Sequence, residues 1–399
     1  MSWRRLDEAD PSGRRVFLRA DLNVPLESGD VADDTRIRGV LPTIRRLLDS
    51  GASLVIASHL GRPDGRVVEG LSLAPVARRL SGLLELPVAV APDCVGKRVS
   101  MMAASLTPGK ILLLENLRFH EEEEKNDPDF AASLAGLADI YVNDAFGTCH
   151  RDHASMTGIP RVLGGGYAGL LLQRELETFE RIAGNPDKPF TLLLGGAKVA
   201  DKVLVVENLI EVADNILIGG GMAFTFLAAL GHGVGRSVLE PDRVDLARNV
   251  IDRAGQSGVR LLLPLDVVVA DSKERPETAR TVSADSIPGD TCGLDIGPAS
   301  VAAFSSVLLE ESRTIVWNGP MGLFEVPPFD RGTVEMARAL ACATRERGAT
   351  TIVGGGDSVR AVSEAGVEDQ LSFISTGGGA SLKLLQGKQL VAVRALSGE

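Results

Sequence analysis

Short runs of almost entirely apolar residues, separated by longer segments of helical periodicity, constrain the fold of this chain more than any other feature. In the first half the runs occupy residues 16–20, 53–57, 88–91, 111–114 and 140–142. Runs of this length without polar alternation are typical of strands buried on both faces of a parallel sheet. Helical periodicity occurs between them, at 40–48 and 73–84. Alternating strands and helices predict a layered α/β domain.

The second half of the sequence repeats this plan. We expect strands at 190–194, 216–218, 260–263, 314–317, 351–353 and 372–375. We expect helices at 204–212, 223–230, 244–254, 334–345 and 359–365. Between the halves, residues 170–182 form an amphipathic helical pattern, and the two prolines that follow, Pro186 and Pro189, end it.

A chain of 399 residues is too long for one ordinary core, so two domains are expected. The predicted fold class is α/β, with two Rossmann-like parallel-sheet domains joined by a hinge helix. We place the N-terminal domain at 1–169, the hinge helix at 170–184 and the C-terminal domain at 185–386. The tail, 387–399, is too short for a core of its own and should pack back on the N-terminal domain.

Composition argues against several classes of protein. No run of about 18 apolar residues occurs, and the N-terminus lacks the apolar stretch of a signal peptide. The net charge of −11 argues against non-specific binding to nucleic acid. The four cysteines lie far apart and form no metal-binding pattern, so reduced thiols in a cytoplasmic protein are expected. The four glutamates at 121–124 are interpreted as a solvated face.

The stretch 191–202 predicts an anion site. Its apolar residues form a strand, after which Gly195 and Gly196 allow a tight turn that bares backbone N–H groups. A helical pattern begins at 197 and places Lys198 and Lys202 one turn apart on the same face. A strand, a glycine turn, the start of a helix and two cations together suit a bound anion.

Ligands in open α/β sheets lie beyond the carboxyl ends of the strands, so the residues after each predicted strand are candidates for function. In the first half these residues are Asp21, Asn23, Arg36, His59, Arg62, Arg118 and Arg151. Arginine binds phosphate and carboxylate groups in a bidentate manner. Four arginines at one sheet edge therefore predict a cradle for a small, multiply anionic ligand.

In the second half, glycine turns open helices at 219–221, 354–356 and 377–379. Each such turn can seat a phosphate on backbone N–H groups. At one of them, the carboxylate of Asp357 would repel phosphate unless a divalent cation stood between the two. Magnesium has this role with nucleotides. The second half is thus predicted to bind a magnesium–nucleotide complex.

Three other known functional sites are not supported, because the sequence lacks residues or spacings that those sites need. His150-Arg151-Asp152 matches the catalytic triplet of protein kinases, but the accompanying asparagine and Gly-rich loop are missing from the sequence. The sequence has no GxxxxGK[ST] and no GxGxxG, so neither a P-loop nor the common dinucleotide fingerprint applies. Cys149, His150 and His153 are too closely spaced for a usual zinc site.

Eight strings, in order and spread over nearly the whole chain, closely resemble those of the phosphoglycerate kinase family. They are Arg19-Ala-Asp21-Leu-Asn23-Val-Pro25, Ser58-His59-Leu-Gly-Arg62-Pro63, Leu114-Glu-Asn-Leu-Arg118-Phe-His120, Asn143-Asp-Ala-Phe-Gly-Thr148, Gly195-Gly-Ala-Lys198-Val-Ala-Asp-Lys202, Trp317-Asn-Gly-Pro-Met-Gly322, Gly354-Gly-Gly-Asp357 and Ser375-Thr-Gly-Gly-Gly-Ala-Ser381. The resemblance implies a monomeric, two-lobed, hinge-bending enzyme of glycolysis. It would interconvert MgATP and 3-phosphoglycerate with MgADP and 1,3-bisphosphoglycerate, the first lobe binding the phosphoglycerate and the second the nucleotide.

The resemblance also implies roles for individual residues. The phosphoglycerate would be bound by Asp21, Asn23, Arg36, His59, Leu60, Gly61, Arg62, Arg118 and Arg151. The nucleotide would be bound by Gly195, Lys198, Lys202, Gly219, Gly293, Asn318, Pro320, Glu325, Gly354, Gly355, Gly356, Asp357 and Ser358. Arg36 and Lys198 would be catalytic, Asp357 would hold Mg²⁺, and the backbone N–H groups of Gly354 and Gly377 would donate to the transition state.

Three positions depart from the family's pattern. Lys383 stands where an acid is common, in a helix that we expect to lie outside the chemistry. Ser358 stands where threonine is usual, and it keeps the hydroxyl group. Cys149 replaces a small residue beside Arg151, which adds a thiol open to modification. None of these three changes removes a group that the reaction needs.

The implied acceptor is a carboxylate with a reference pKa of about 3.5–4, so it is ionised at neutral pH and needs no general base. The difficulty is that an anionic nucleophile must approach an anionic phosphorus. Positioning and charge neutralisation must therefore carry catalysis. Closure of two lobes would bring the substrates together and expel water.

Two rival functions remain at this stage. A doubly wound oxidoreductase would share the fold class, but the sequence has no GxGxxG to bind its dinucleotide. A non-catalytic anion-binding protein would not need Arg36, Lys198 and Asp357, all of which are present.

Overall fold

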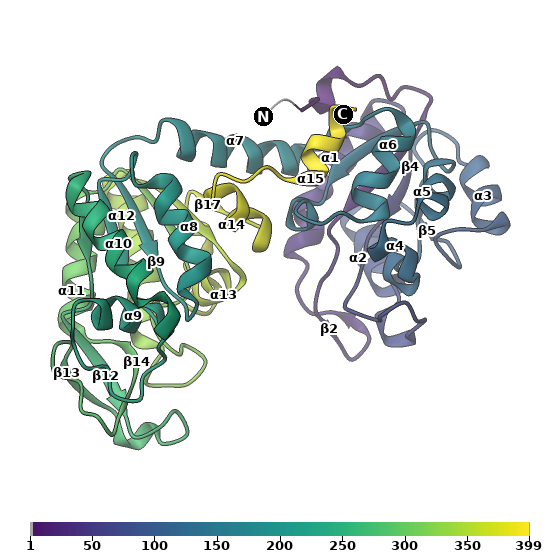
Figure 1. Cartoon of the computed structure of the whole chain (residues 1–399). Coiled ribbons are helices and arrows are strands. Elements are labelled where there is room, and N and C mark those ends of the chain that lie inside the picture. The colour runs from purple at the N-terminus through teal and green to yellow at the C-terminus, as the bar shows by residue number, and fades with distance from the viewer. Residues whose placement is uncertain (1–2, 399) are drawn as a thin grey trace. The chain divides into compact units, whose positions relative to one another are not determined.

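The computed structural model describes residues 3–398, which fold into two compact units (Figure 1). Unit 1 contains the residues up to Thr178 together with those from Gln389 onward, and unit 2 runs from Phe179 to Lys388. The boundary between the units falls inside helix α7 (Leu170–Gly184). Within residues 3–398, no helix is long and apolar enough to cross a membrane.

Unit 1 is built on a six-stranded parallel sheet with the order β5-β6-β4-β1-β7-β8. Its strands are β1 (Arg15–Ala20), β4 (Ser53–Ala57), β5 (Val88–Val90), β6 (Ile111–Leu113), β7 (Ile140–Asp144) and β8 (Tyr167–Ala168). Strands β4 and β7, on either side of β1, are buried along their whole length, as expected where helices cover both faces of a sheet. The register pairs Ala20 with Asp144, so the loops after β1 and β7 begin side by side at the carboxyl edge.

The helices of unit 1 pack their apolar sides against this sheet. They are α1 (Thr35–Asp49), α2 (Ala74–Leu84), α3 (Lys97–Ala104), α4 (Glu121–Lys125), α5 (Pro128–Ala135), α6 (Ile159–Leu163) and α15 (Val391–Leu396). One core joins alternate residues of β1, such as Leu18, to Ile44 of α1 and Leu80 of α2. Because side chains alternate along a strand, Arg19 points to the opposite face. Short turns complete the unit: η1 (Leu6–Glu8), η2 (Glu69–Leu71), η3 (Leu117–Phe119), η4 (Phe146–Thr148), η5 (Ala154–Gly158) and the hairpin β2 (Leu26–Glu27) with β3 (Asp30–Val31).

Unit 2 contains a second six-stranded parallel sheet, with the order β11-β10-β9-β15-β16-β17. Its strands are β9 (Phe190–Leu194), β10 (Asn215–Ile218), β11 (Arg260–Leu262), β15 (Thr314–Asn318), β16 (Thr350–Gly354) and β17 (Phe373–Ile374). The register pairs Leu194 with both Ile218 and Asn318, and Asn318 with Gly354. The loops after four neighbouring strands therefore begin at one level of the sheet edge.

Helices and a small antiparallel sheet complete unit 2. The helices are α8 (Val199–Leu209), α9 (Met222–Ala229), α10 (Val244–Gln256), α11 (Pro298–Ser306), α12 (Arg331–Arg347), α13 (Gly356–Glu364) and α14 (Gly379–Leu385). The antiparallel sheet has the order β13-β12-β14, with β12 (Asp266–Ala270), β13 (Arg280–Ser283) and β14 (Cys292–Ile296). Short helical turns are η6 (Pro241–Arg243), η7 (Pro276–Thr278), η8 (Val307–Glu311) and η9 (Glu368–Gln370). The main core surrounds Trp317, which is fully buried, and a separate cluster joins the small sheet to α9.

The predicted fold class is confirmed, since both halves contain parallel sheets with intervening helices. The eleven predicted strands correspond to β1, β4, β5, β6, β7, β9, β10, β11, β15, β16 and β17, with ends shifted by at most two residues. Several helix starts were wrong by three to five residues, since α1, α12 and α13 begin at 35, 331 and 356 rather than at 40, 334 and 359. Helix α8 begins at Val199, between the start of the helical pattern at 197 and the predicted helix at 204–212. The antiparallel sheet of β12, β13 and β14 was not predicted. Strand β14 alternates partly exposed with buried residues and has no continuous apolar run, whereas the apolar run at 267–270 in β12 was overlooked.

Helix α7 starts in unit 1, where side chains cap its first turn. The Leu170 N–H donates to Thr43 Oγ1 at 2.9 Å, and the Leu172 N–H donates to Asp144 Oδ1 at 3.0 Å. Burial raises the pKa of Asp144 to about 7.

The C-terminal segment belongs to the same unit as the N-terminal sheet. Helix α15, drawn in yellow, contacts η5, α6 and β8 (Figure 1). The Gly166 N–H donates to the Leu396 carbonyl at 3.0 Å, and the Ala392 N–H donates to the Cys149 carbonyl at 3.1 Å. The tail thus completes the packing of unit 1 through its own buried side chains, which include Leu390 and Leu396.

Candidate active site

Polar side chains gather at the carboxyl edge of the unit 1 sheet. Arg36, in the first turn of α1, places Nη1 3.0 Å from Oδ1 of Asp21, which follows β1. Asp21 is largely covered, with 11% of its side chain exposed, whereas Arg36 keeps 38% exposed. The carboxylate therefore orients the guanidinium while leaving much of it open to solvent and to a ligand.

A second group of contacts orders the loop after β4. The Gly61 N–H donates to Asn23 Oδ1 at 2.9 Å, and Arg118 Nη1 donates to the Gly61 carbonyl at 2.7 Å. The neighbouring Leu60 N–H donates to Oδ1 of the buried Asn116 at 3.1 Å. The loop after β4 is thus bonded to the segments after two other strands, β1 and β6, which holds these polar groups in fixed positions.

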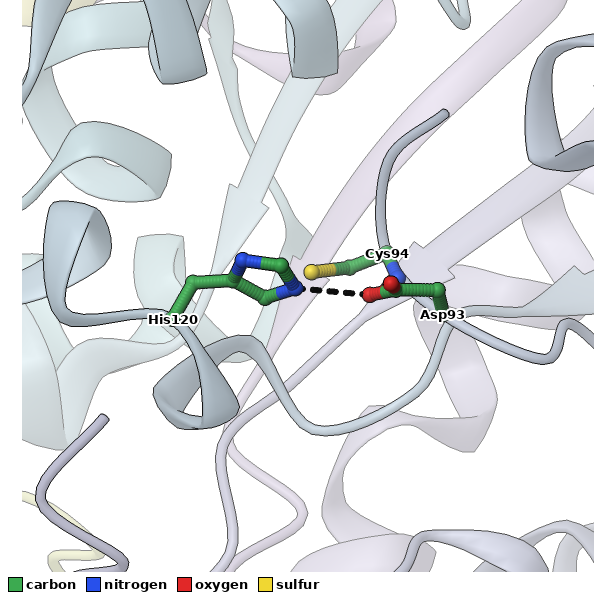
Figure 2. A group of neighbouring side chains, drawn as sticks. All are labelled: Asp93, Cys94 and His120. Carbon is green, nitrogen blue, oxygen red and sulfur yellow. Dashed lines mark hydrogen bonds and ion pairs between the residues drawn. The ribbon is translucent and has the colours of Figure 1, made fainter. Parts of the chain in front are cut away.

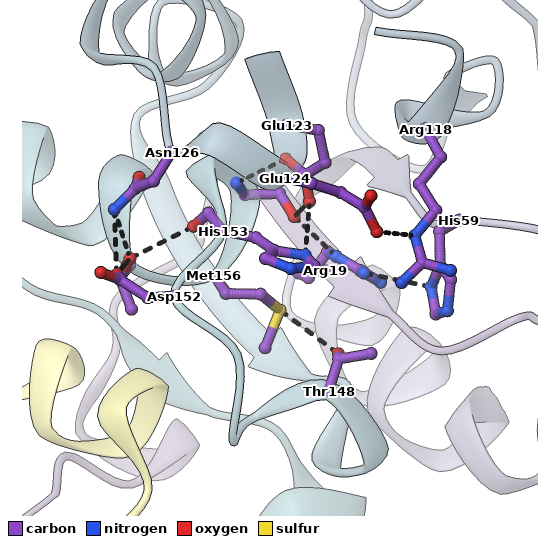
Figure 3. Close-up of polar contacts among 12 residues, drawn as sticks. Arg19, His59, Arg118, Glu123, Glu124, Asn126, Thr148, Asp152, His153 and Met156 are labelled. Atoms are coloured by element: carbon purple, nitrogen blue, oxygen red, sulfur yellow. Dashed lines mark hydrogen bonds and ion pairs between the residues drawn. The ribbon is translucent and has the colours of Figure 1, made fainter. Parts of the chain in front are cut away.

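His59 lies beneath this surface and takes part in a buried network with Arg19 (Figure 3). Arg19 Nη2 lies 3.2 Å from Nδ1 of His59. Because a guanidinium can only donate, Nδ1 accepts and the imidazole proton resides on Nε2. Burial, together with the charges of Arg19 and three other arginines, holds the pKa of His59 well below its ordinary value of 6.5. His59 is therefore neutral at physiological pH.

The positive charge of Arg19 is balanced from below by Glu123. Arg19 Nε donates to Ser155 Oγ at 2.9 Å, and Ser155 Oγ donates to Glu123 Oε1 at 2.6 Å. The Ser155 N–H also donates to Glu123 Oε2 at 2.9 Å. Burial raises the pKa of Glu123, and the nearby Arg19 and Ser155 oppose that rise. The solvated-face interpretation is wrong for this glutamate, because its side chain is only 1% exposed.

Arg118, Arg151 and Arg62 differ in their surroundings. The Arg118 side chain is 5% exposed, and its Nε lies 3.1 Å from Glu124 Oε1, an ion pair without hydrogen-bond geometry (Figure 3). Burial and the charge of Arg151 lower the pKa of Arg118, although a guanidinium stays protonated in proteins. Arg151 is partly buried and Arg62 is exposed. Because these arginines carry like charges close together, binding of an anion between them would be favourable.

The thiol at position 149 does not behave as the sequence suggested. Cys149 is fully buried, and burial raises the pKa of its thiol. Its Sγ lies 3.5 Å from the Ala145 carbonyl. A buried, protonated thiol is unreactive, so the expected sensitivity to modification is not supported.

In unit 2, close backbone approaches form the floor of the site. The Gly195 N–H donates to the Asn318 carbonyl at 3.0 Å, and the Gly196 N–H donates to the Pro320 carbonyl at 2.7 Å. A Cβ at Gly195 would collide with the carbonyls of Gly319 and Pro320, so only glycine fits there. Gly196 has a φ of +85°, in the region that glycine adopts without strain.

A cavity of about 410 Å³ lies on this floor. It is lined by predicted nucleotide-binding residues: Gly195, Lys198, Lys202, Asn318, Pro320, Gly355, Gly356, Asp357 and Ser358. Gly356 begins α13, so the first N–H groups of that helix face the same region. Lys198 and Asp357 are exposed, which leaves a cation and a carboxylate available beside N–H donors.

An adjoining cavity of about 380 Å³ is largely apolar. It shares Pro320 and Asp357 with the first, and it also includes Gly293 and Glu325. Apolar walls come from residues that the sequence analysis did not select: Phe224, Val238, Val267, Met321 and Leu323. The ring of Phe224 packs so closely on Gly293 that a Cβ there would overlap it. A planar apolar group can fit beside a polar one in this pair of cavities.

Three predicted glycines do not line either cavity. Gly219 and Gly354 end or follow strands beneath the floor, and the Gly219 N–H donates to the Leu194 carbonyl at 2.8 Å. The Gly377 N–H donates to Ser375 Oγ at 3.2 Å. The N-terminus of α8 is also occupied, because the Val199 N–H donates to Glu240 Oε1 at 2.6 Å. That carboxylate was not predicted, and it lies some forty residues away in sequence.

The fold and these sites define a class. One parallel-sheet unit has clustered guanidinium groups, which suit an anionic acceptor. The other has a cavity lined by lysine and glycine beside an apolar cavity, which suits a phosphate donor. Together these features are those of an α/β phosphotransferase with an anionic acceptor.

Comparisons with known proteins specify the family. A model of the phosphoglycerate kinase family matches residues 6–388. The chain is 53% identical over 397 residues to a phosphoglycerate kinase of Desulforudis audaxviator, with 99% of both chains covered. It is 52% identical over 392 residues to the cytosolic phosphoglycerate kinase of Triticum aestivum, with 98% of this chain and 97% of the relative covered. The structure of phosphoglycerate kinase from Coxiella burnetii superposes with a TM-score of 0.86 at 38% identity and covers 99% of each chain.

The chain belongs to the phosphoglycerate kinase family. Its reaction is the phosphoryl transfer of glycolysis and gluconeogenesis between ATP and the carboxylate of 3-phosphoglycerate.

Proposed function

We propose that unit 1 binds 3-phosphoglycerate and unit 2 binds MgATP, with the roles of individual residues assigned as follows. The observation that carries this division is chemical. Unit 1 gathers Arg36, Arg118 and Arg151 around the neutral His59, whereas unit 2 has adjoining polar and apolar cavities. The first set suits a small molecule with two acidic groups, and the second suits a nucleotide.

In unit 1, the groups are arranged to bind rather than to abstract protons. Asp21 orients Arg36, and Asn23 with Arg118 orders the loop that carries Gly61. The proton on Nε2 makes His59 a neutral donor to a phosphate or carboxylate oxygen. We assign Arg62 and Arg151 to the same ligand, together with the backbone of Leu60 and Gly61. The acceptor carboxylate is ionised already, so no base is assigned.

In unit 2, Lys198 and Lys202 are assigned to the phosphates of ATP, and Lys198 to the phosphoryl group in transfer. Gly293 would border the adenine and Glu325 the ribose, while the first turn of α13 would bind phosphate oxygens. We keep the prediction that Gly219 and Gly354 bind the nucleotide. The backbone N–H groups of Gly354 and Gly377 stay the predicted donors to the transition state. The Gly377 N–H would first have to break its hydrogen bond to Ser375 Oγ.

Asp357 is the residue assigned to Mg²⁺. Its exposed carboxylate lies at a cavity that also contains Lys198 and Lys202, so it fits a hard cation that shares phosphate oxygens. When bound, the ion would offset negative charge on the phosphates.

Phosphoryl transfer also requires that the two substrates meet without water. We propose that the two units close on each other to bring the substrates together. We assign the hinge of this closure to α7, which contains the boundary between the two units. A monomeric enzyme acting in the cytoplasm completes the proposal. Small-angle scattering with each substrate alone and with both checks the movement: compaction is expected only with both, and an unchanged radius of gyration would contradict the hinge role.

The direct test is consumption of ATP that depends on 3-phosphoglycerate and on magnesium. Lys198→Ala should lower kcat roughly a thousandfold, by analogy with other cationic groups that act on transferring phosphoryl groups. Lys188→Ala is the matched control, because Lys188 pairs with Asp214 at 3.2 Å outside both cavities. A loss below tenfold for a folded Lys198→Ala protein would show that the catalytic cation is another residue.

A further inference from the structure

Asp93, Cys94 and His120 converge in unit 1 outside the residues assigned to either substrate (Figure 2). Asp93 and Cys94 follow β5, and His120 follows η3, which comes after β6. Strands β5 and β6 are neighbours in the sheet, so the loops after them start from the same edge. The order of the strands thereby brings Cys94 and His120, which are 26 positions apart in the sequence, close together.

The three side chains each turn a metal-ligand atom toward a common point, as Figure 2 shows. A carboxylate oxygen, Sγ and an imidazole nitrogen all lie within 4.8 Å of one another. Ligand atoms bound to one tetrahedral zinc are about 3.3–3.7 Å apart, given bond lengths of roughly 2.0–2.3 Å. Movements of about an ångström would therefore place these three atoms as three of the four ligands of a tetrahedral metal site.

The surroundings are already ordered and electronegative. His120 Nε2 lies 2.7 Å from Asp93 Oδ1, and the His120 ring packs on Phe130 with ring centroids 5.2 Å apart. The Asp93 carbonyl accepts from the Glu115 N–H at 3.4 Å. Burial raises the pKa of the Cys94 thiol, and the carboxylates of Asp93 and Glu123 raise it further. The contacts of His120 with Asp93 and Phe130 hold the imidazole and the carboxylate in place before any cation binds.

Burial differs among the three ligands in a way that leaves room for entry. Cys94 is fully buried, whereas 27% of the His120 side chain and 48% of the Asp93 side chain are exposed. A metal would thus be held from below by sulfur and reached from the side of the imidazole and carboxylate. The exposed side leaves the fourth position to water, as in zinc sites with three protein ligands.

We propose that Asp93, Cys94 and His120 form a binding site for a borderline-soft divalent cation of the zinc class. Binding would release the thiol proton of Cys94 to solvent, while the imidazole of His120 stays neutral with its one proton on the ring nitrogen that does not bind the metal. Hard cations such as Mg²⁺ prefer all-oxygen ligands, so the site should discriminate against the ion assigned to the nucleotide. The proposal does not rest on the residue roles assigned to either substrate.

The test uses the full-length, metal-free protein without nucleotide. Co²⁺ serves as the probe, because a bond from cobalt to thiolate gives an intense near-ultraviolet charge-transfer band. We expect the band to saturate at one Co²⁺ per chain and to disappear when Zn²⁺ is added. Thermal unfolding should shift to higher temperature with Zn²⁺, since a ligand that binds only the folded state stabilises it.

Variants assign the band to this cluster. Cys94→Ala should abolish it, and His120→Asn should weaken Co²⁺ and Zn²⁺ binding at least about tenfold, since even residues behind the ligands cost that much. Cys342→Ala, at a partly exposed thiol in unit 2, should leave both measurements unchanged. His120→Asn keeps the test valid should Cys94→Ala fail to fold. Absence of the band, or its persistence in Cys94→Ala or in His120→Asn at unchanged affinity, would overturn the proposal.

Discussion

The backbone N–H of Gly319 donates a 2.6 Å hydrogen bond to Oγ of Ser358. Gly319 lies in the loop after β15, and Ser358 lies in the first turn of α13, so the bond ties two walls of the polar cavity together. Ser358 is fully buried, so its hydroxyl supplies the Gly319 N–H with a hydrogen-bond acceptor at a place that solvent water does not reach. The serine has a structural use in addition to its assigned contact with the nucleotide.

Ser358→Ala should leave the Gly319 N–H buried without an acceptor, which costs about 1–3 kcal/mol. We expect a lower midpoint of thermal unfolding and a KM for ATP raised about tenfold, with the KM for 3-phosphoglycerate unchanged. Ser358→Thr keeps the hydroxyl and is the matched control, expected close to the parent in both measurements. An alanine variant with parental KM for ATP and parental stability would show that the bond is dispensable.

Arg36→Ala should lower kcat roughly a thousandfold, because the variant loses the cation that we assign to the charge developing in transfer. Arg38→Ala is the control on the same helix: its side chain is 56% exposed and pairs with Asp34. An exposed ion pair contributes at most about 1 kcal/mol, so stability and kcat should barely change. Steady-state kinetics on both variants, with circular dichroism to check folding, make the comparison. Equal losses in the two variants would contradict the special role of Arg36.

The parallel sheets could be predicted from sequence because continuous apolar runs report burial on both faces. Polar groups whose burial depends on distant partners could not. Glu123 sits among four consecutive glutamates and looks solvated, yet Ser155, more than thirty residues away, supplies the donors that allow it to be buried. Asp93, Cys94 and His120 match no metal spacing for the same reason, since only the order of β5 and β6 brings them together.

The candidate substrate site was easier to predict, because its residues directly follow strands whose order can be inferred. Asp21, His59 and Arg118 were expected at one edge, and their contacts in the structure share that edge. Its supporting residues were missed. Arg19 lies within a strand and has no sequence signal apart from being a charge in an apolar run, and Glu240 caps α8 from a loop that carries no motif.

Gly293→Ala should impair the binding of ATP by moving the ring of Phe224. A Cβ at position 293 would overlap that ring, and the ring lines the apolar cavity into which it would be pushed. We expect the KM for ATP to rise about tenfold, equivalent to about 1.4 kcal/mol of binding, with no change in the KM for 3-phosphoglycerate. Gly289→Ala is the control, because no atom lies within 4 Å of a Cβ there. A normal KM for ATP in Gly293→Ala would place the adenine elsewhere.

His153 should make the protein sensitive to acid. Burial, followed by the charges of Arg19 and Arg151, lowers its pKa from 6.5 to about 3, and its side chain is 12% exposed. The unfolded chain takes up this proton below about pH 6.5, whereas the folded chain resists it until about pH 3. The contribution of His153 to the free energy of unfolding therefore falls as the pH drops through that window, by about 1–2 kcal/mol between pH 7 and pH 5. His153→Gln should lose less stability over the same interval in urea unfolding, whereas His232→Gln, at a half-buried histidine in unit 2, should follow the parent. If His153→Gln and the parent lost stability in parallel, the neutral, buried state of His153 would be wrong.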